Sequence, residues 1–332
     1  MLDYFYSSAR VRALETGLLS RDALSRLLEA TTLDAAYAML SELGYTLQTD
    51  ANGKVLREEM LSERLAQAYA EIAALTEDAN TRVFALWRYP YDCNNVKAAI
   101  KGFVRGKACD GMMIDLGTVS VADVMAAVQT GNFSALPAQM AEAAQEAVSA
   151  YAKTQNPQQI DLLLDRACYR DMLDAAEESG VEYAIKLVRT KIDLLNLVMC
   201  IRVVRMRYGE GGRTLLQDAL LDGGTLPKDL IMELYQTEER RIWERLSYTD
   251  YKGFAQAFSS NEPTLTEVER AADDFWMSIV RQARFVSCGA EVLIGYLCGV
   301  ECEVRNLRVL FAGKAAGLAG ETVWERIREG YV

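Results

Sequence analysis

Histidine is absent from this sequence of 332 residues. Ser-His-Asp and Cys-His nucleophile systems, HExxH metalloproteases and Glu-x-x-His di-iron bundles all depend on an imidazole group. The absence of histidine therefore excludes these mechanisms, and with them most classes of hydrolase.

Proline is scarce, with five residues, and the alternation of β-branched residues that is typical of strands hardly appears. Alanine, leucine, glutamate and arginine are abundant, and these residues favour helices. Apolar residues make up 51% of the chain, which is enough for two or three units with hydrophobic cores. The composition predicts an all-α protein.

Long apolar runs are also missing. A membrane-spanning helix needs about 18 apolar residues in succession, and the longest run, at 292–300, has half that length. The first residues, "MLDYFYSSARVRALE", lack the basic start and apolar stretch of a secretory signal. We expect a soluble protein that stays inside the cell and does not insert into a membrane.

Positive charge is in deficit: 36 Lys and Arg against 47 Asp and Glu give 36 − 47 = −11. This balance disfavours binding to nucleic acids and to anionic lipid surfaces.

The seven cysteines are odd in number and form no CxxC pair, so neither a disulfide framework nor a zinc site is indicated. We expect buried thiols in a reducing cytoplasm.

A short polar motif occurs three times. It consists of an acidic residue, two further residues, an asparagine and then Val or Leu. The spacings between its copies are 193 − 92 = 101 and 303 − 193 = 110 residues. The polar residues of the three copies are Asp92 with Asn95, Asp193 with Asn196, and Glu303 with Asn306.

A second landmark repeats in the same register. "GLLSRDAL" from Gly17, "GTVSVADV" from Gly117 and "GTLPKDLI" from Gly224 are spaced by 117 − 17 = 100 and 224 − 117 = 107 residues. Two landmarks in register indicate a threefold internal repeat. We predict three helical subdomains at 1–108, 109–212 and 213–332.

Each copy has signals for where its helices begin. Ser20, Ser120 and the residue before Pro227 lie where the first short helix of each copy is expected to be capped. Apolar spacing predicts that 58–85 forms one helix about 40 Å long. The Asn52-Gly53 pair permits a small hairpin, although an ordinary loop is the preferred interpretation.

The sequence also contains longer stretches typical of one family. The opening "YSSARVRALETGLLS", the three acid-x-x-Asn helices and the closing "ECEVRNLRVLFAGKAAGL...ERIRE" resemble the C-type subunit of archaeal and bacterial A/V-type rotary ATPases, which corresponds to the d-type subunit of the eukaryotic V-ATPase. The resemblance spans essentially the whole chain. One departure is Val198, which stands where Lys97 and Arg308 stand in the other two copies.

The resemblance implies a fold and a role. The three helical subdomains would surround a pseudo-threefold axis and form a funnel. One copy per complex would sit on the cytoplasmic face of the membrane rotor ring, an oligomer of the c/K-type subunit, and hold the foot of the central stalk of D- and F-type subunits. It would link ATP turnover to proton or sodium transport, with no catalytic residue, cofactor or metal of its own.

The repeated polar residues have two interpretations. They could contact the stalk or the ring, or they could pin each final helix to a neighbouring backbone, because buried carboxylates and amides must be paired. We favour the second interpretation, since one asymmetric stalk would select different residues in each copy. On the same helices, Lys97, Lys101 and Arg202 could meet acidic groups on a partner, or could offset the carboxylates and the dipole of their own helix, and we favour the second interpretation. Arg308 stands at the position of Lys97 in the third copy and is a candidate for subdomain packing or partner contact.

Two other functions remain open on the sequence. A generic helical-repeat scaffold that binds soluble partners is the first, although the period of about 100 residues exceeds the roughly 34 to 47 residues of common helical repeats. An all-α enzyme is the second, because Asp273-Asp274 resembles the start of the magnesium motif of prenyl and terpene synthases. That motif needs another aspartate at the position of Met277, so we expect no metal site there.

Overall fold

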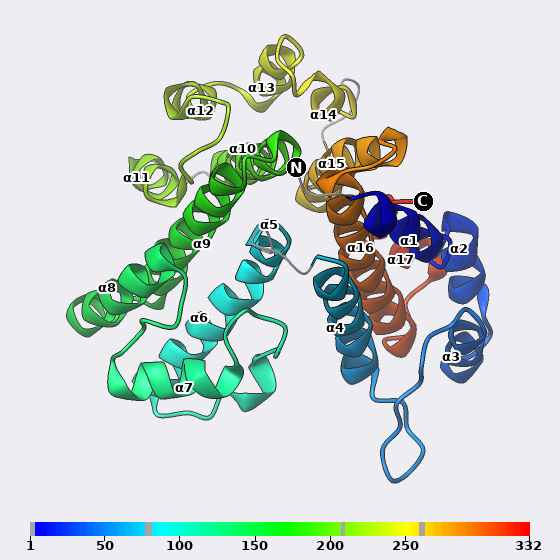
Figure 1. Cartoon of the computed structure of the whole chain (residues 1–332). Coiled ribbons are helices and arrows are strands. Elements are labelled where there is room, and N and C mark those ends of the chain that lie inside the picture. Colours follow the sequence, from blue (N-terminus) through cyan, green and yellow to red (C-terminus); the bar gives the residue numbers. More distant parts are fainter. Residues whose placement is uncertain (1–3, 77–81, 207–209, 259–262) are drawn as a thin grey trace. The chain divides into compact units, whose positions relative to one another are not determined.

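Every regular element in the described part of the chain is a helix, apart from one antiparallel bridge between Thr49 and Val55. The computed structural model describes residues 4–76, 82–206, 210–258 and 263–332. The prediction of an all-α protein is confirmed. Figure 1 labels these helices along the chain.

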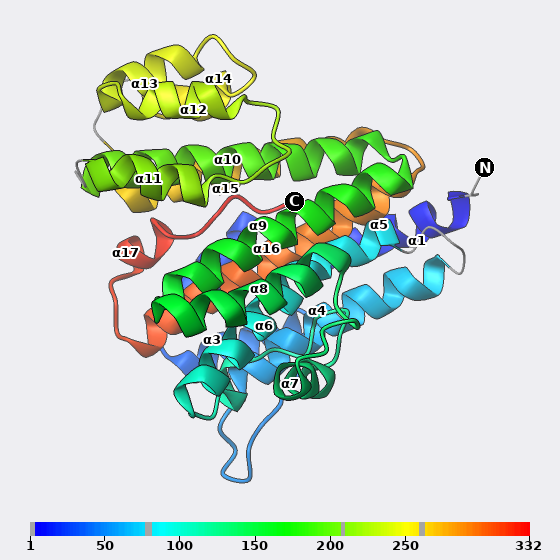
Figure 2. The same cartoon turned by 90° about the vertical axis from the view of Figure 1, so that its left-hand side faces the viewer.

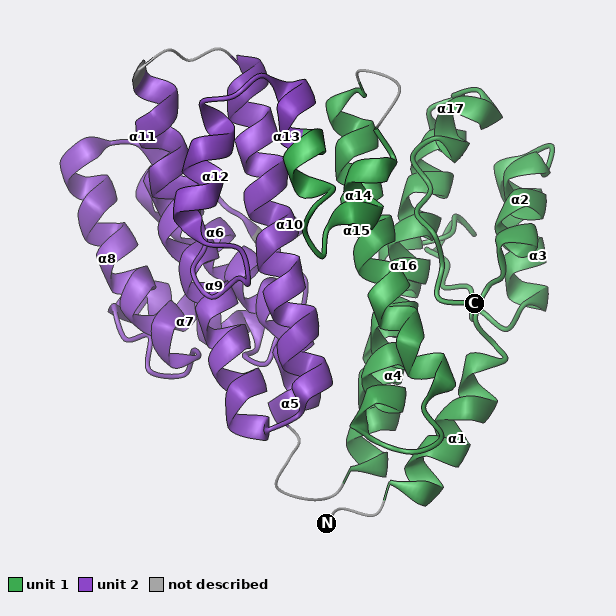
Figure 3. Ribbon diagram, turned by 90° about the horizontal axis from the view of Figure 1, so that it is seen from above, with its two compact units in different colours: residues 1–78, 243–332 green, residues 79–242 purple. Residues whose placement is uncertain are grey.

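The helices belong to two compact units, coloured separately in Figure 3. Unit 1 combines both ends of the sequence, residues 1–78 and 243–332, and unit 2 comprises residues 79–242. The three predicted subdomains and their arrangement as a funnel remain predictions.

Unit 2 is built around the long helices α9 and α10. Helix α9 packs against α6, α8 and α10, and α6 also packs against α7. Helices α11 and α12 cover another part of α10. Figure 2 shows α8 running beside α9. The elements are α5 (Arg82–Ala85), η1 (Leu86–Arg88), α6 (Tyr89–Arg105), η2 (Asp110–Met112), α7 (Val121–Thr130), α8 (Ala138–Thr154), α9 (Pro157–Ser179), α10 (Glu182–Met206), α11 (Glu210–Ala219) and α12 (Lys228–Tyr235).

Unit 1 is built around one long helix, α16, which contacts α1, α2, α3, α4, α15, α17 and η3. Residues 292–300 of α16 are all buried, which explains why this stretch is apolar on every side. The elements are α1 (Phe5–Glu15), α2 (Arg21–Glu29), α3 (Leu33–Glu42), α4 (Arg57–Leu75), α14 (Lys252–Gln256), α15 (Leu265–Val280), η3 (Arg281–Phe285), α16 (Ala290–Ala315) and α17 (Gly320–Trp324). Helix α13 (Glu239–Leu246) spans the boundary between the units.

The predicted helix starts agree closely with the structure. The hydroxyl of Ser20 accepts the backbone N–H of Ala23, and that of Ser120 accepts the N–H of Asp123, so both serines cap their helices. In the third copy the cap position is Pro227 itself, one residue later than predicted. Local sequence therefore determines where the first helix of each copy begins.

Two local predictions need correction or refinement. The single helix predicted for 58–85 is wrong, because α4 ends at Leu75 and Thr76 leaves the helical conformation. Residues 77–81 lie outside the described part of the chain. Around Asn52-Gly53, the bridge between Thr49 and Val55 makes a minimal hairpin, with Asp50 N–H donating to the Lys54 carbonyl at 2.9 Å.

Candidate functional site

The six repeated acidic and amide residues are all buried: Asp92, Asp193 and Asn306 are 0% exposed, and Asn95, Asn196 and Glu303 are at most 4% exposed. They lie on α6, α10 and α16, near the start of α6 and within the other two helices. Each acid–amide pair binds backbone groups of a segment distant in sequence. We call these three arrangements clasps 1, 2 and 3.

Clasp 1 consists of Asp92 and Asn95 with the segment 114–119. The Asp92 carboxylate accepts the N–H groups of Thr118 at 2.9 Å and Val119 at 3.0 Å, together with the Thr118 hydroxyl at 2.7 Å. The Asn95 side chain donates to the Ile114 carbonyl at 2.8 Å and accepts the Ile114 N–H at 2.9 Å. The side chains of Asp92 and Asn95 thus pair with backbone N–H and C=O groups of 114–119, much as the backbone of a neighbouring β-strand would.

Clasp 2 repeats this geometry with Asp193, Asn196 and the segment 221–226. The Asp193 carboxylate accepts the N–H groups of Thr225 at 2.7 Å and Leu226 at 3.0 Å. Asn196 donates to the Leu221 carbonyl at 3.0 Å and accepts the Leu221 N–H at 2.8 Å. The two clasps therefore use the same groups in the same order.

Clasp 3 uses Glu303 and Asn306, but its backbone partners come from two segments. Glu303 accepts the Leu19 N–H and the Tyr45 hydroxyl, both at 2.5 Å. Asn306 donates to the Arg328 carbonyl and accepts the Arg328 N–H, both at 2.9 Å. In every clasp the acid binds the N–H two residues after the repeated glycine, at Leu19, Val119 or Leu226.

The clasps connect successive copies of the repeat. The acid at 92 binds the turn that begins at Gly117, the acid at 193 binds the turn at Gly224, and the acid at 303 binds the turn at Gly17. With the subdomain boundaries predicted from the sequence, the final helix of each copy is thus fixed to the start of the next, and that of the third copy to the start of the first. The two sequence landmarks are therefore the two halves of one contact.

The two repeated glycines of unit 2 are required by this contact. A Cβ atom on Gly117 would lie 2.1 Å from Asp92 Oδ1, and one on Gly224 would lie 2.1 Å from Asp193 Oδ1. At Gly17 the nearest atom would be the Leu14 carbonyl oxygen at 3.4 Å. The longer side chain of Glu303 therefore reaches its turn without approaching Gly17.

Burial raises the pKa of Asp92, although hydrogen bonds from Val119 and Thr118 oppose this effect. Burial likewise raises the pKa of Glu303, opposed by the Leu19 N–H, the Tyr45 hydroxyl and Arg64. Arg64 lies 3.6 Å from the Glu303 carboxylate. Asp92 and Glu303 are buried, and all the hydrogen-bond donors named here belong to the chain itself. These acids are therefore suited to fixing helices to neighbouring segments of the fold rather than to contacting a partner protein.

The repeated cations pair with other helices of the fold. Lys97 contacts Asp165 and Lys101 contacts Asp161, both at 2.5 Å and both on α9. Arg308 of α16 contacts Glu58 of α4 at 3.0 Å. The interpretation that Lys97 and Lys101 offset carboxylates on their own helix is therefore wrong, because sequence spacing along α6 does not reveal which helix packs against it.

The remaining two positions of this set lie on α10. Val198, at the position of Lys97 and Arg308, is 9% exposed, and Arg202 is half-buried. At this position the second copy therefore has a buried apolar residue, whereas the other two have a cation in an ion pair.

The aspartate pair of α15 is engaged within the chain. Asp273 contacts Arg305 at 3.2 Å and Arg328 at 3.3 Å, and Asp274 accepts the Glu329 N–H at 2.7 Å. In the described residues, no three His, Cys, Asp or Glu side chains gather as metal ligands would. No described helix combines the length and the apolar character needed to cross a bilayer.

Sequence analysis missed a further buried acid, Asp171 on α9. Its carboxylate accepts the N–H groups of Gln139 at 3.0 Å and Met140 at 2.8 Å, and so caps the first turn of α8. Burial raises the pKa of Asp171, and the two backbone N–H groups oppose this. Asp171 could have been found from its position four residues after Ala167, which places it on the apolar face of the helix, because an acid on such a face requires a partner.

Comparison with known proteins gives one consistent family. The family model described as "ATP synthase (C/AC39) subunit" matches residues 7–326. The C subunit of the V-type sodium ATPase of Enterococcus hirae is 22% identical over 336 residues, covering 99% of each chain. The C subunit of the A-type ATP synthase of Methanocaldococcus jannaschii is 23% identical, covering 96% of this chain and 85% of the relative.

The C subunit of the V-type ATP synthase of Deinococcus radiodurans is also 23% identical, over 98% of this chain and 91% of the relative. The family match extends from before Gly17 to after Asn306, so it covers the three acid–amide pairs and the three glycine turns, and it ends two residues before Arg328. The resemblance found in the sequence is confirmed, and the chain belongs to the ATP synthase (C/AC39) subunit family.

Proposed function

We propose that this protein is the non-catalytic adapter of an A/V-type rotary ATPase or ATP synthase, which joins the central stalk to the membrane rotor ring and transmits torque between them. Family membership supports this role, as do relatives named as the C subunits of a sodium ATPase and of ATP synthases. The adapter works as part of a complex that couples ATP turnover to transport of protons or sodium.

The observation that carries the proposal is the order in which the clasps connect the copies: first to second, second to third, and third to first. Clasps 1 and 2 lie within unit 2 and clasp 3 lies within unit 1, so each clasp strengthens the packing inside its own unit. An element that transmits torque must deform little under load, and close-packed helices with buried, paired polar groups resist sliding. The clasp residues therefore hold the adapter together, and stalk and ring contacts come from other residues.

The proposed place of the adapter is the cytoplasmic face of the membrane, as one copy in each complex. Its contacts are with the ring of c/K-type subunits on one side and the D- and F-type stalk subunits on the other. The net charge of −11 is compatible with this place, since it limits adsorption to anionic lipid headgroups.

The test is co-purification of the full-length, affinity-tagged protein from detergent-solubilised membranes of its host at low ionic strength. We expect the ring subunit and both stalk subunits to elute with it in constant proportion. A variant with the exposed substitution Asp222→Asn serves as a matched control and should recover the same set. Recovery of soluble proteins alone by a folded, tagged chain would instead favour the helical scaffold.

A further inference from the structure

Clasp 3 differs from the other two in how its parts are connected. In clasps 1 and 2 the residue paired with the asparagine and the turn bound by the acid lie on one continuous segment, 114–119 or 221–226. In clasp 3 the asparagine pairs with Arg328 and the acid binds Leu19. These two residues come from opposite ends of unit 1, whose segments 1–78 and 243–332 are joined along the chain through unit 2.

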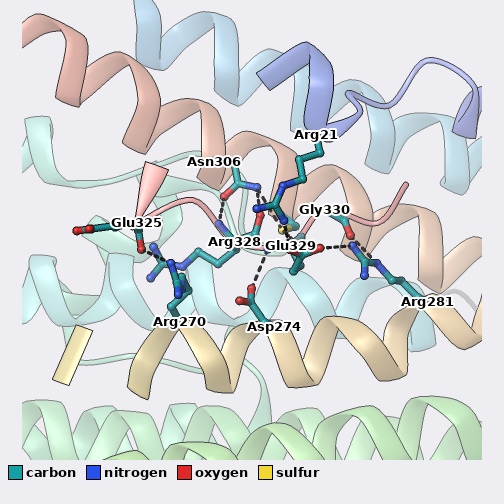
Figure 4. A network of polar contacts seen from close by, with 10 residues as sticks. Arg21, Arg270, Asp274, Arg281, Asn306, Glu325, Arg328, Glu329 and Gly330 are labelled. Atoms are coloured by element: carbon teal, nitrogen blue, oxygen red, sulfur yellow. Dashed lines mark hydrogen bonds and ion pairs between the residues drawn. The ribbon is translucent and has the colours of Figure 1, made fainter. Parts of the chain in front are cut away.

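The segment 325–332, which we call the strap, has no regular structure after α17 and is held by side chains of α15 and η3 (Figure 4). Arg270 donates to the Glu325 carbonyl at 2.7 Å, and Asp274 accepts the Glu329 N–H at 2.7 Å. Arg281 donates to the Gly330 carbonyl at 2.7 Å and pairs with the Glu329 carboxylate at 3.0 Å. Backbone groups of the strap, which lack helical hydrogen-bond partners, are therefore paired with side chains of α15 and η3.

A seat for the strap is formed on α16 by two glycines four residues apart. A Cβ atom on Gly295 would lie 2.7 Å from the Tyr331 hydroxyl, and one on Gly299 would lie 2.9 Å from the Tyr331 Cβ atom. Tyr331 is 2% exposed, and its hydroxyl donates to Glu15 of α1 at 2.9 Å. The ring thus packs on the C-terminal half of unit 1 while its hydroxyl binds the N-terminal half.

The strap also joins the halves next to clasp 3 itself. Glu329 pairs with Arg21, which begins α2 two residues after Leu19 and also lies over the Trp324 ring, 5.1 Å from its centroid. Arg281 holds the other oxygen of Glu329. One carboxylate of the strap therefore connects the start of α2 to η3.

No covalent bond reinforces this junction, since all seven cysteines are free. We propose that the strap is a latch: it takes the place of the continuous chain present in clasps 1 and 2, so that clasp 3 opens as one cooperative step that releases the strap and the Gly17–Leu19 turn together while clasps 1 and 2 stay closed. This inference concerns the chain in isolation and does not depend on the proposed role in a rotary complex.

Hydrogen exchange of the full-length protein, followed by mass spectrometry, tests the latch. In Tyr331→Ala, which empties the seat between Gly295 and Gly299, we expect exchange to rise about tenfold or more in peptides covering 17–24 and 325–332 alike, with no change at 114–119 or 221–226. The matched variant Asp193→Asn should raise exchange at 221–226 and leave both segments of clasp 3 protected.

A rise confined to the strap, or an equal rise in all three clasps, would overturn the latch. If Tyr331→Ala does not fold, the unsubstituted protein in sub-denaturing guanidinium gives the same answer. There the strap and the Gly17–Leu19 turn should share one opening free energy, lower than that of the other two turns. Different opening free energies for the strap and this turn would contradict the proposal.

Discussion

The carboxylate of Asp92 occupies the space where a side chain on Gly117 would begin, since Oδ1 lies 2.1 Å from the position of an added Cβ atom. Asp193 and Gly224 have the same relationship in clasp 2. Each pair joins a helix core to a turn that lies beyond a predicted subdomain boundary. The acid can therefore occupy its position only if the residue at the start of the turn is a glycine.

The first prediction follows from this contact. Gly117→Ala and Gly224→Ala should each lower the free energy of unfolding by about 2 kcal/mol, because the added methyl group displaces a buried carboxylate from its backbone donors. Urea denaturation followed by circular dichroism measures the change. Gly17→Ala is the matched control, since its methyl group would meet only the Leu14 carbonyl at an ordinary distance of 3.4 Å. An equal loss at all three glycines would refute this account.

The second prediction concerns the acid itself. Asp193→Asn keeps the shape of the side chain but places an NH₂ group against the N–H of Thr225 or Leu226, leaving a buried donor unpaired. The expected cost is about 2 kcal/mol of unfolding free energy. Asp222→Asn, which removes an exposed ion pair with Lys228, should cost less than about 1 kcal/mol. Similar effects for the two substitutions would mean that clasp 2 contributes little.

The third prediction is a pH dependence. Burial raises the pKa of Glu303 above 4.5 in the folded chain, so the folded state holds this proton more tightly than the unfolded state. The resulting stabilisation is present below pH 4.5 and is lost as pH rises through the folded pKa. Unfolding free energies measured at pH 4.5 and at neutral pH should therefore fall more for the unsubstituted protein than for Glu303→Gln. Parallel pH profiles would show that Glu303 does not titrate as its burial implies.

The fourth prediction separates the protein from all-α prenyl and terpene synthases. Asp273 is paired with Arg305 and Arg328, and Asp274 with the Glu329 N–H, so neither carboxylate is arranged to bridge a metal and a diphosphate. Calorimetric titration with magnesium and diphosphate together should give no heat beyond dilution. Saturable binding that disappears in Asp273→Asn would revive the enzyme hypothesis.

Much of the local structure could be predicted because its causes are local. Ser20 and Ser120 cap helices through hydrogen bonds to residues three positions away. The end of α4 at Leu75 was missed, although no large apolar residue occurs between Leu75 and Val83 in the sequence. The partners of Lys97 and Lys101 were also missed, because they depend on α9 packing against α6.

The sequence by itself determined that this is a helical protein in which a glycine turn and an acid–amide pair each recur three times along the chain. Those features lie in residue types and their spacing, so they can be read without coordinates. Only the tertiary structure decided that Asp92 and Asp193 each bind the next glycine turn along the chain, and that Glu303 binds Leu19 across 284 residues of sequence. A carboxylate can accept from any backbone N–H that packing brings within reach, and spacing along a chain does not specify which one that is.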